Sequence, residues 1–226
     1  MIVLSKINMK YFIYKSLNNV IPMQNELEMI QTLFQYQNFG LVPFPIKPFS
    51  KDLYSEGDGF RLYKNALSGI TISEEEIYEY FGQKKLDNCG LLLGEKGNLS
   101  IIEFESESRI SELKTFIENK PTPNISDVIL INLLENGFES ETSILTPENK
   151  IQMWFKFSDN LPDFHWKMHE DRTELNGINL LSNGYIVAPP SAIKLNNKNM
   201  AQFEIINGKE PTKFPSEISF FSNLIS

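Results

Sequence analysis

Two carboxylates end an apolar segment in the middle of the sequence. In the run from Ile101 to Glu105, the side chains of Glu103 and Glu105 are two residues apart, so they project from the same face of an extended strand. Such a pair can hold one or two divalent cations, which neutralise triphosphate charge and activate an attacking hydroxyl in phosphoryl transfer. Acidic alternation is also common on solvent-facing strands. The pair therefore has a catalytic and a surface interpretation.

A second segment with chemical potential covers residues 151–157. Its odd-numbered residues are all apolar, and its other face carries Gln152, Trp154 and Lys156. This alternation predicts a strand that buries the apolar face and offers the second face to a cleft. Gln152 and Lys156 could then contact a triphosphate. For Trp154, stacking on a nucleotide and packing against neighbouring side chains are both open.

Three separated blocks resemble the bifunctional DNA primase/polymerase domain of the archaeo-eukaryotic primase superfamily. Residues 89–94 and 99–105 are similar to its paired strands, the second of which ends in an acidic-x-acidic motif. Residues 146–157 resemble its Thr-Gly-x-Gly-Gly-x-His-aromatic strand. Residues 183–191, Asn-Gly-Tyr-Ile-Val-Ala-Pro-Pro-Ser, resemble its Gly-Tyr-Val-Val-Ala-Pro-Pro-Ser block, which is the most specific of the three. The resemblance covers about residues 25–220.

The resemblance implies a role for individual residues. It makes Glu103 and Glu105 metal ligands, puts Asn179 at the position of a third catalytic acid, and puts Gln152 at the position of a phosphate-contacting histidine. The expected cofactor is Mg²⁺ or Mn²⁺. The expected partners are a nucleoside triphosphate, single-stranded or primed DNA, and a separate helicase or replication protein. The expected nucleotide-binding residues are Gln152, Lys156, Trp154 and Ser191.

The chain departs from the family pattern at these positions. Gln152 can donate a hydrogen bond but cannot carry the positive charge of histidine, and Asn179 removes one negative charge from the metal site. Glutamates replace aspartates in the acidic pair, and residues 149–151 replace the glycines that precede the histidine. An acid nearby in sequence could take the third position, although the spacing to the Gly-Tyr block favours Asn179; the candidates are Glu170, Asp171 and Glu174.

Three functional hypotheses follow. The first is an enzyme that performs metal-dependent, template-directed nucleotidyl transfer during replication of a plasmid, phage or other mobile element. The second is a degenerate domain of the same fold that binds a nucleotide or nucleic acid without turnover. The third is an accessory protein that uses the fold as a scaffold, because fold similarity alone does not establish activity.

The coarse pattern predicts one α+β domain over residues 1–226, with a central mixed or antiparallel sheet and flanking helices around a cleft. Glycine and proline punctuation separates the expected elements, and the run 127–134 fits either helix or strand. Expected helices are 25–39, 73–81 with a Ser73/Glu76 capping box, 107–118 and a closing helix within 215–225. Expected strands are 41–46, 151–157, 185–188 and a hairpin of 89–93 with 99–105, while 47–67 is expected to be a surface loop.

Composition narrows the class of protein. The net charge of −8 and the pI of about 4.9 exclude a broad basic face for duplex DNA. Cys89 is the only cysteine, so neither an internal disulfide nor a cysteine-built zinc site is expected. Without an apolar run of about 20 residues, we expect a cytoplasmic protein without a membrane span. His165 and His169 are interpreted as surface residues rather than metal ligands, and Gly94 to Gly97 as a turn.

Overall fold

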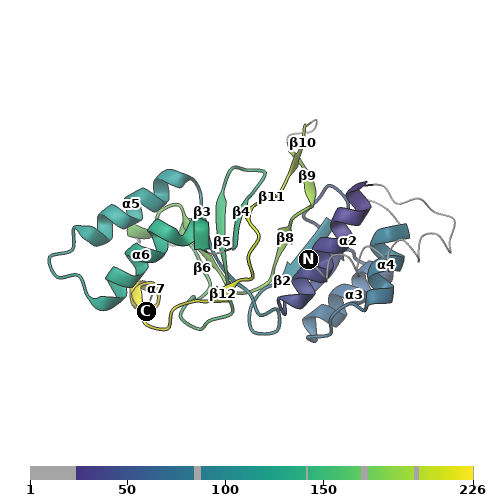
Figure 1. The fold of residues 1–226 in the computed structure, drawn as a ribbon, viewed down its shortest axis with the longest axis horizontal. Helices are drawn as coiled ribbons and strands as arrows, with labels where there is room; N and C mark the ends of the chain where they lie inside the picture. The colour runs from purple at the N-terminus through teal and green to yellow at the C-terminus, as the bar shows by residue number, and fades with distance from the viewer. Residues whose placement is uncertain (1–23, 84–87, 141, 169–172, 196–198, 226) are drawn as a thin grey trace. The chain divides into compact units, whose positions relative to one another are not determined.

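The computed structural model describes residues 24–83, 88–140, 142–168, 173–195 and 199–225. The chain forms two compact units (Figure 1). Of the described residues, the first contains those up to Leu92 together with those from Ile186 to Gln202, and the second contains those from Leu93 to Tyr185 and those after Gln202. Helices and mainly antiparallel sheets confirm the α+β class. Among the described residues, no helix has the length and apolar character needed to cross a bilayer.

The first unit has helices against a sheet with the strand order β1-β2-β8. Phe44 of β1 is fully buried and lies against the ring of Tyr63 in α3, with 5.1 Å between centroids. A two-stranded ribbon, β9 with β10, belongs to the same unit. The elements are α2 (Gln24–Asn38), β1 (Pro43–Ile46), α3 (Gly57–Leu67), α4 (Glu74–Gln83), β2 (Asn88–Leu92), β8 (Tyr185–Ala188), β9 (Ala192–Leu195) and β10 (Asn199–Gln202).

The capping box predicted for α4 is confirmed. The backbone N–H of Glu76 donates to Ser73 Oγ at 3.2 Å, and the backbone N–H of Ser73 donates to Glu76 Oε2 at 3.0 Å. Two N–H groups that the first turn leaves without helical partners are thereby satisfied. Arg61 of α3 also pairs with Glu76 at 2.9 Å, so the box links two helices of this unit.

The surface loop predicted for residues 47–67 is wrong over its second half, which forms α3. Three residues at helical spacing are buried on one face of α3: Gly59, Leu62 and Ala66. The glycines and charged residues of the segment conceal this spacing in the sequence. Gly59 lies so close to Tyr54 and Tyr80 that a Cβ atom would approach their side chains to 2.4 Å and 2.8 Å. Glycine here therefore serves close packing.

The second unit is a sheet with the strand order β11-β4-β5-β3-β7-β6, with β12 parallel to the end of β5. The run 127–134, undecided from sequence, lies in a helix. The elements are β3 (Ser100–Phe104), α5 (Glu107–Glu118), α6 (Ile125–Ser140), β4 (Thr142–Leu145), β5 (Ile151–Lys156), β6 (Phe164–His165), η1 (Trp166–Met168), η2 (Thr173–Leu175), β7 (Ile178–Leu181), β11 (Glu204–Asn207), β12 (Thr212–Lys213) and α7 (Phe220–Ile225).

The hairpin predicted for residues 89–93 and 99–105 is wrong in its pairing. Both strands exist, but β2 pairs with β1 in the first unit and β3 pairs with β5 and β7 in the second. Across the turn between them, only Gly94 and Leu99 form an isolated antiparallel bridge. Gly94 has φ +83, and a Cβ there would lie 2.8 Å from the Ser182 carbonyl oxygen, so this position requires glycine.

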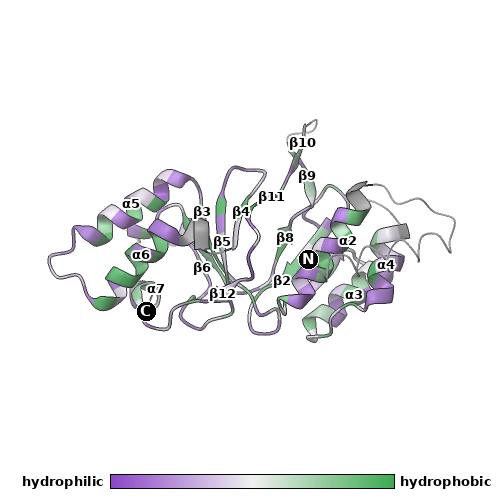
Figure 2. Ribbon diagram, in the orientation of Figure 1, coloured by the Kyte–Doolittle hydropathy of each residue, from purple (hydrophilic) through white to green (hydrophobic). Residues whose placement is uncertain are grey.

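One face of the larger sheet forms the core with α5, α6 and α7. In Figure 2, hydrophobic green residues are prominent on α6, while α5 carries more hydrophilic purple. Buried side chains from all three helices meet the sheet in this core. Its sheet residues come from four adjacent strands, β5, β3, β7 and β6: Ile102, Phe104, Ile151, Met153, Phe155, Phe164, Ile178 and Leu180. The intervening residues of β3, β5 and β7 therefore belong to the opposite face.

We predict that Ser73→Ala lowers the free energy of unfolding by about 0.5–2 kcal/mol, because α4 loses its N-terminal cap. Urea unfolding followed by circular dichroism measures the loss. Ser111→Ala, at an exposed position inside α5, is the matched control and should change stability much less. Equal effects of the two substitutions would contradict the capping role.

Candidate functional site

The antiparallel register of three strands brings a polar set together on the face opposite the helices. Glu103 of β3 is directly opposite Gln152 of β5 on one side and Asn179 of β7 on the other. Residues directly opposite in an antiparallel pair project to the same face. Three of the residues singled out in the sequence, distant along the chain, therefore meet.

The Glu103 carboxylate accepts hydrogen bonds from three side chains. Lys150 Nζ lies 2.7 Å from Oε1, Asn179 Nδ2 lies 3.1 Å from Oε1, and Gln152 Nε2 lies 2.9 Å from Oε2. Glu103 is only 8% exposed. A buried carboxylate is costly without such partners, and here one cation and two amides supply them.

Two further groups fix the orientation of the amides. The indole Nε1–H of Trp154 donates to Gln152 Oε1 at 3.1 Å, and the backbone N–H of Trp166 donates to Asn179 Oδ1 at 3.3 Å. Both groups are donors only, so each amide must turn its oxygen toward them and its NH₂ toward Glu103. We call Glu103, its three hydrogen-bond donors Lys150, Gln152 and Asn179, and the groups of Trp154 and Trp166 that hold the amides, the Glu103 network.

Lys150 reaches the network from the turn between β4 and β5. The Thr146 N–H donates to the Lys150 carbonyl oxygen at 2.9 Å, and the Lys150 N–H donates to Thr146 Oγ1 at 3.1 Å. Asn149 adopts φ 62 within this turn, a conformation that asparagine tolerates better than most residues. Sequence reasoning did not assign Lys150 to the site. Its position two residues before Gln152 is the signal that was available.

The network controls the protonation of Glu103. Burial alone would raise the pKa of this carboxyl, but hydrogen bonds from Lys150 and Gln152, the Lys150 charge and the Asn179 amide together outweigh burial and lower its pKa. The group is therefore ionised near neutral pH and forms a neutral pair with Lys150.

The residues of the network do not fit a divalent cation. Mg²⁺ and Mn²⁺ prefer oxygen ligands, whereas both amides present NH₂ groups to Glu103 and Lys150 presents an ammonium, none of which can ligate a cation. Glu105, the second residue of the predicted acidic pair, is exposed just beyond β3, where its backbone N–H donates to the Gly177 carbonyl oxygen. In the described parts of the chain, no cluster of three His, Cys, Asp or Glu residues could hold a metal ion.

The remaining predicted residues have other surroundings. Lys156 pairs with Glu210 at 2.6 Å. Ser191 belongs to the first unit, where its hydroxyl accepts the Cys89 N–H at 2.8 Å. Gln152 and Trp154 are 3% and 0% exposed, so the prediction that their face of β5 is open to a cleft is wrong for both. Trp154 is a buried hydrogen-bond donor in this structure.

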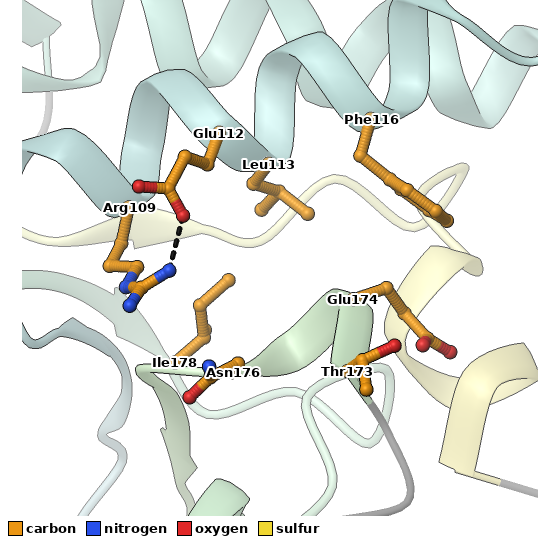
Figure 3. A pocket seen from close by; sticks show the side chains of 8 residues that line it. All are labelled: Arg109, Glu112, Leu113, Phe116, Thr173, Glu174, Asn176 and Ile178. Atoms are coloured by element: carbon orange, nitrogen blue, oxygen red, sulfur yellow. Dashed lines mark hydrogen bonds and ion pairs between the residues drawn. The ribbon is translucent and has the colours of Figure 1, made fainter.

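A separate hollow of about 220 Å³ lies between α5 and the segment from η2 to β7 (Figure 3). Glu174, one alternative third acid, lines this hollow. The other two alternatives, Glu170 and Asp171, lie outside the described residues, as does His169. His165 Nε2 lies 3.8 Å from Asp163 Oδ2. The lining residues are Arg109, Glu112, Leu113, Phe116, Thr173, Glu174, Asn176 and Ile178.

No family model matches the chain. No curated protein matches it either. The sequence blocks and the geometry of the Glu103 network are therefore the observations that bear on function.

We predict that Glu103→Gln alters the acid dependence of stability. Because the pKa of Glu103 is lowered in the folded state, its stabilisation is present above the ordinary carboxyl pKa of about 4.3 and is lost as pH falls through the folded value. Urea unfolding from pH 7 to pH 3 should show a wild-type advantage that shrinks below about pH 4.3. Glu105→Gln, at an exposed position, is the control. A pH-independent difference would refute this linkage.

We predict that Trp154→Phe destabilises the protein by about 1–3 kcal/mol through the lost donor to Gln152, in addition to the cost of lost volume. A double-mutant cycle with Gln152→Leu separates the two contributions, measured by urea unfolding. The double variant should lose less than the sum of the single variants, because neither polar group is then left unpaired. Strict additivity would show that the hydrogen bond contributes nothing.

Proposed function

We propose that this chain is a primase-polymerase-type domain that binds a nucleotide or nucleic acid without turnover, in the replication system of a plasmid, phage or other mobile element. One observation carries the proposal. The Glu103 carboxylate accepts hydrogen bonds from three side chains, among them the Lys150 ammonium. The proposed fold is that of the archaeo-eukaryotic primases, and the support for it is the set of sequence blocks that ends in residues 183–191.

The electrostatics of the network favour binding over metal-dependent catalysis. Glu103 and Lys150 neutralise one another, and the two amides are neutral. A second cation would have to displace the ammonium and would then find a single carboxylate in place of the several oxygen ligands it needs. The net charge of −8 restricts any nucleic-acid contact to a local one.

Template-directed nucleotidyl transfer is the second candidate. The observation that favours it is the retained acidic pair, in which Glu105 is exposed two residues after Glu103. The expected metal in that case is Mg²⁺ or Mn²⁺. For the reason given above, the network in its present arrangement does not fit this metal.

We predict that the folded protein binds a fluorescent nucleoside triphosphate or single-stranded DNA but does not extend a primer. Anisotropy measures binding, and a gel assay with a primed single-stranded template, all nucleotides and Mg²⁺ or Mn²⁺ measures extension. An active polymerase of the same superfamily is the positive control. Extension that Glu103→Gln and Glu105→Gln each abolish would establish the enzyme instead. A folded protein that binds neither the nucleotide nor the single-stranded DNA would refute the binding module and leave the scaffold hypothesis.

A further inference from the structure

We infer that Lys150 is the phosphate-binding residue of the Glu103 network, that Glu103 positions it, and that a nucleoside triphosphate binds here without a divalent cation. This inference rests on the proposed function and specifies how its nucleotide ligand is held. It assigns to Glu103 a role different from the metal ligation that the sequence suggested.

The geometry leaves Lys150 accessible while its partner is buried. The Lys150 side chain is 33% exposed, whereas that of Glu103 is 10% exposed. An ammonium has three N–H donors, and the 2.7 Å contact with Glu103 Oε1 uses one. The exposed member of the ion pair is therefore an ammonium that has N–H donors beyond the one used by Glu103. Phosphate oxygens accept hydrogen bonds from such a group.

Pairing with a buried carboxylate also prepares Lys150 for a ligand. A free lysine side chain loses about 2 kcal/mol of rotamer entropy when it is fixed, and the contact with Glu103 imposes much of that order before any ligand arrives. The same device occurs in protein kinases, where a glutamate holds the lysine that contacts nucleotide phosphates. Here the turn hydrogen bonds between Thr146 and Lys150 add a second restraint on the backbone.

The network lets Lys150 shift toward a ligand at limited cost. If Lys150 moves to a phosphate, Glu103 still accepts from Gln152 and Asn179. Each carboxylate oxygen keeps one donor, so the buried charge still has hydrogen-bond partners. The amides themselves bring no charge to the phosphate, which leaves Lys150 as the network's cation.

Because the amides of the network present no oxygen to a metal, binding of a triphosphate to Lys150 does not require one. Gln152 and Asn179 direct their oxygens at Trp154 and at the Trp166 backbone. A metal ion bound to the triphosphate therefore gains no more than the Glu103 carboxylate from the network, and it must displace Lys150 to reach Oε1. A metal-free triphosphate meets the ammonium directly.

The test is titration of a fluorescent ATP analogue into the full chain, once in EDTA and once in Mg²⁺, with inorganic triphosphate as competitor. We expect wild-type affinity to persist in EDTA and inorganic triphosphate to displace the analogue. Lys150→Gln should weaken binding at least about tenfold, the cost of one charged hydrogen bond. Lys150→Arg keeps the charge and should bind more tightly than Lys150→Gln. Lys114→Gln is the matched control, because Lys114 is 31% exposed and paired with Glu135.

The outcomes separate this inference from the proposed function. Nucleotide binding that needs Mg²⁺, or that Lys150→Gln leaves at wild-type strength, would overturn the inference and leave the binding module standing. Binding of single-stranded DNA without any nucleotide binding would do the same. A folded wild-type protein that binds neither ligand would overturn both. Thermal unfolding of each variant shows whether it is folded, and Lys150→Arg keeps the test decisive if Lys150→Gln does not fold.

Discussion

A carboxylate withdrawn from water at the centre of a sheet has to be met by hydrogen-bond donors, and Glu103 imposes this requirement on its neighbours. β5 and β7 supply the amides of Gln152 and Asn179 at the directly opposed positions, and the β4–β5 turn supplies Lys150. The amides in turn need donors for their own oxygens, which Trp154 and Trp166 supply. The side-chain orientations in this region therefore depend on the hydrogen-bonding needs of one buried charge.

The alternation of strands explains how such a network coexists with an apolar core. Ile102 and Phe104 flank Glu103 in β3 and belong to the core that α5, α6 and α7 share. A shift of one residue in the pairing of β3 would bring Glu103 to that core and expel both apolar neighbours from it. The apolar face therefore fixes the register, and the register fixes which polar residues meet.

Local patterns in the sequence predicted local structure well. The Ser73/Glu76 cap, the helix from Glu107 and the strand that contains Gln152 each follow from a few consecutive residues. Pairing of β3 depends on strands about 50 and 75 residues further along, for which the turn after β2 carries no information. For the same reason Lys150 was not recognised, since its role depends on a carboxylate distant in sequence. The resemblance named Glu103, Gln152 and Asn179 together, which local patterns could not do.

The hydrogen bond from the buried indole of Trp154 has a practical consequence. The chain has 2 tryptophans, and both donate to amides that hold Glu103, one through its indole and the other through its backbone. Indole emission responds to nearby charge, and Trp154 is one hydrogen bond from Gln152, which itself contacts the ion pair. The protein thus carries an intrinsic optical reporter at its candidate site, so unlabelled ligands could be followed by their effect on its native fluorescence.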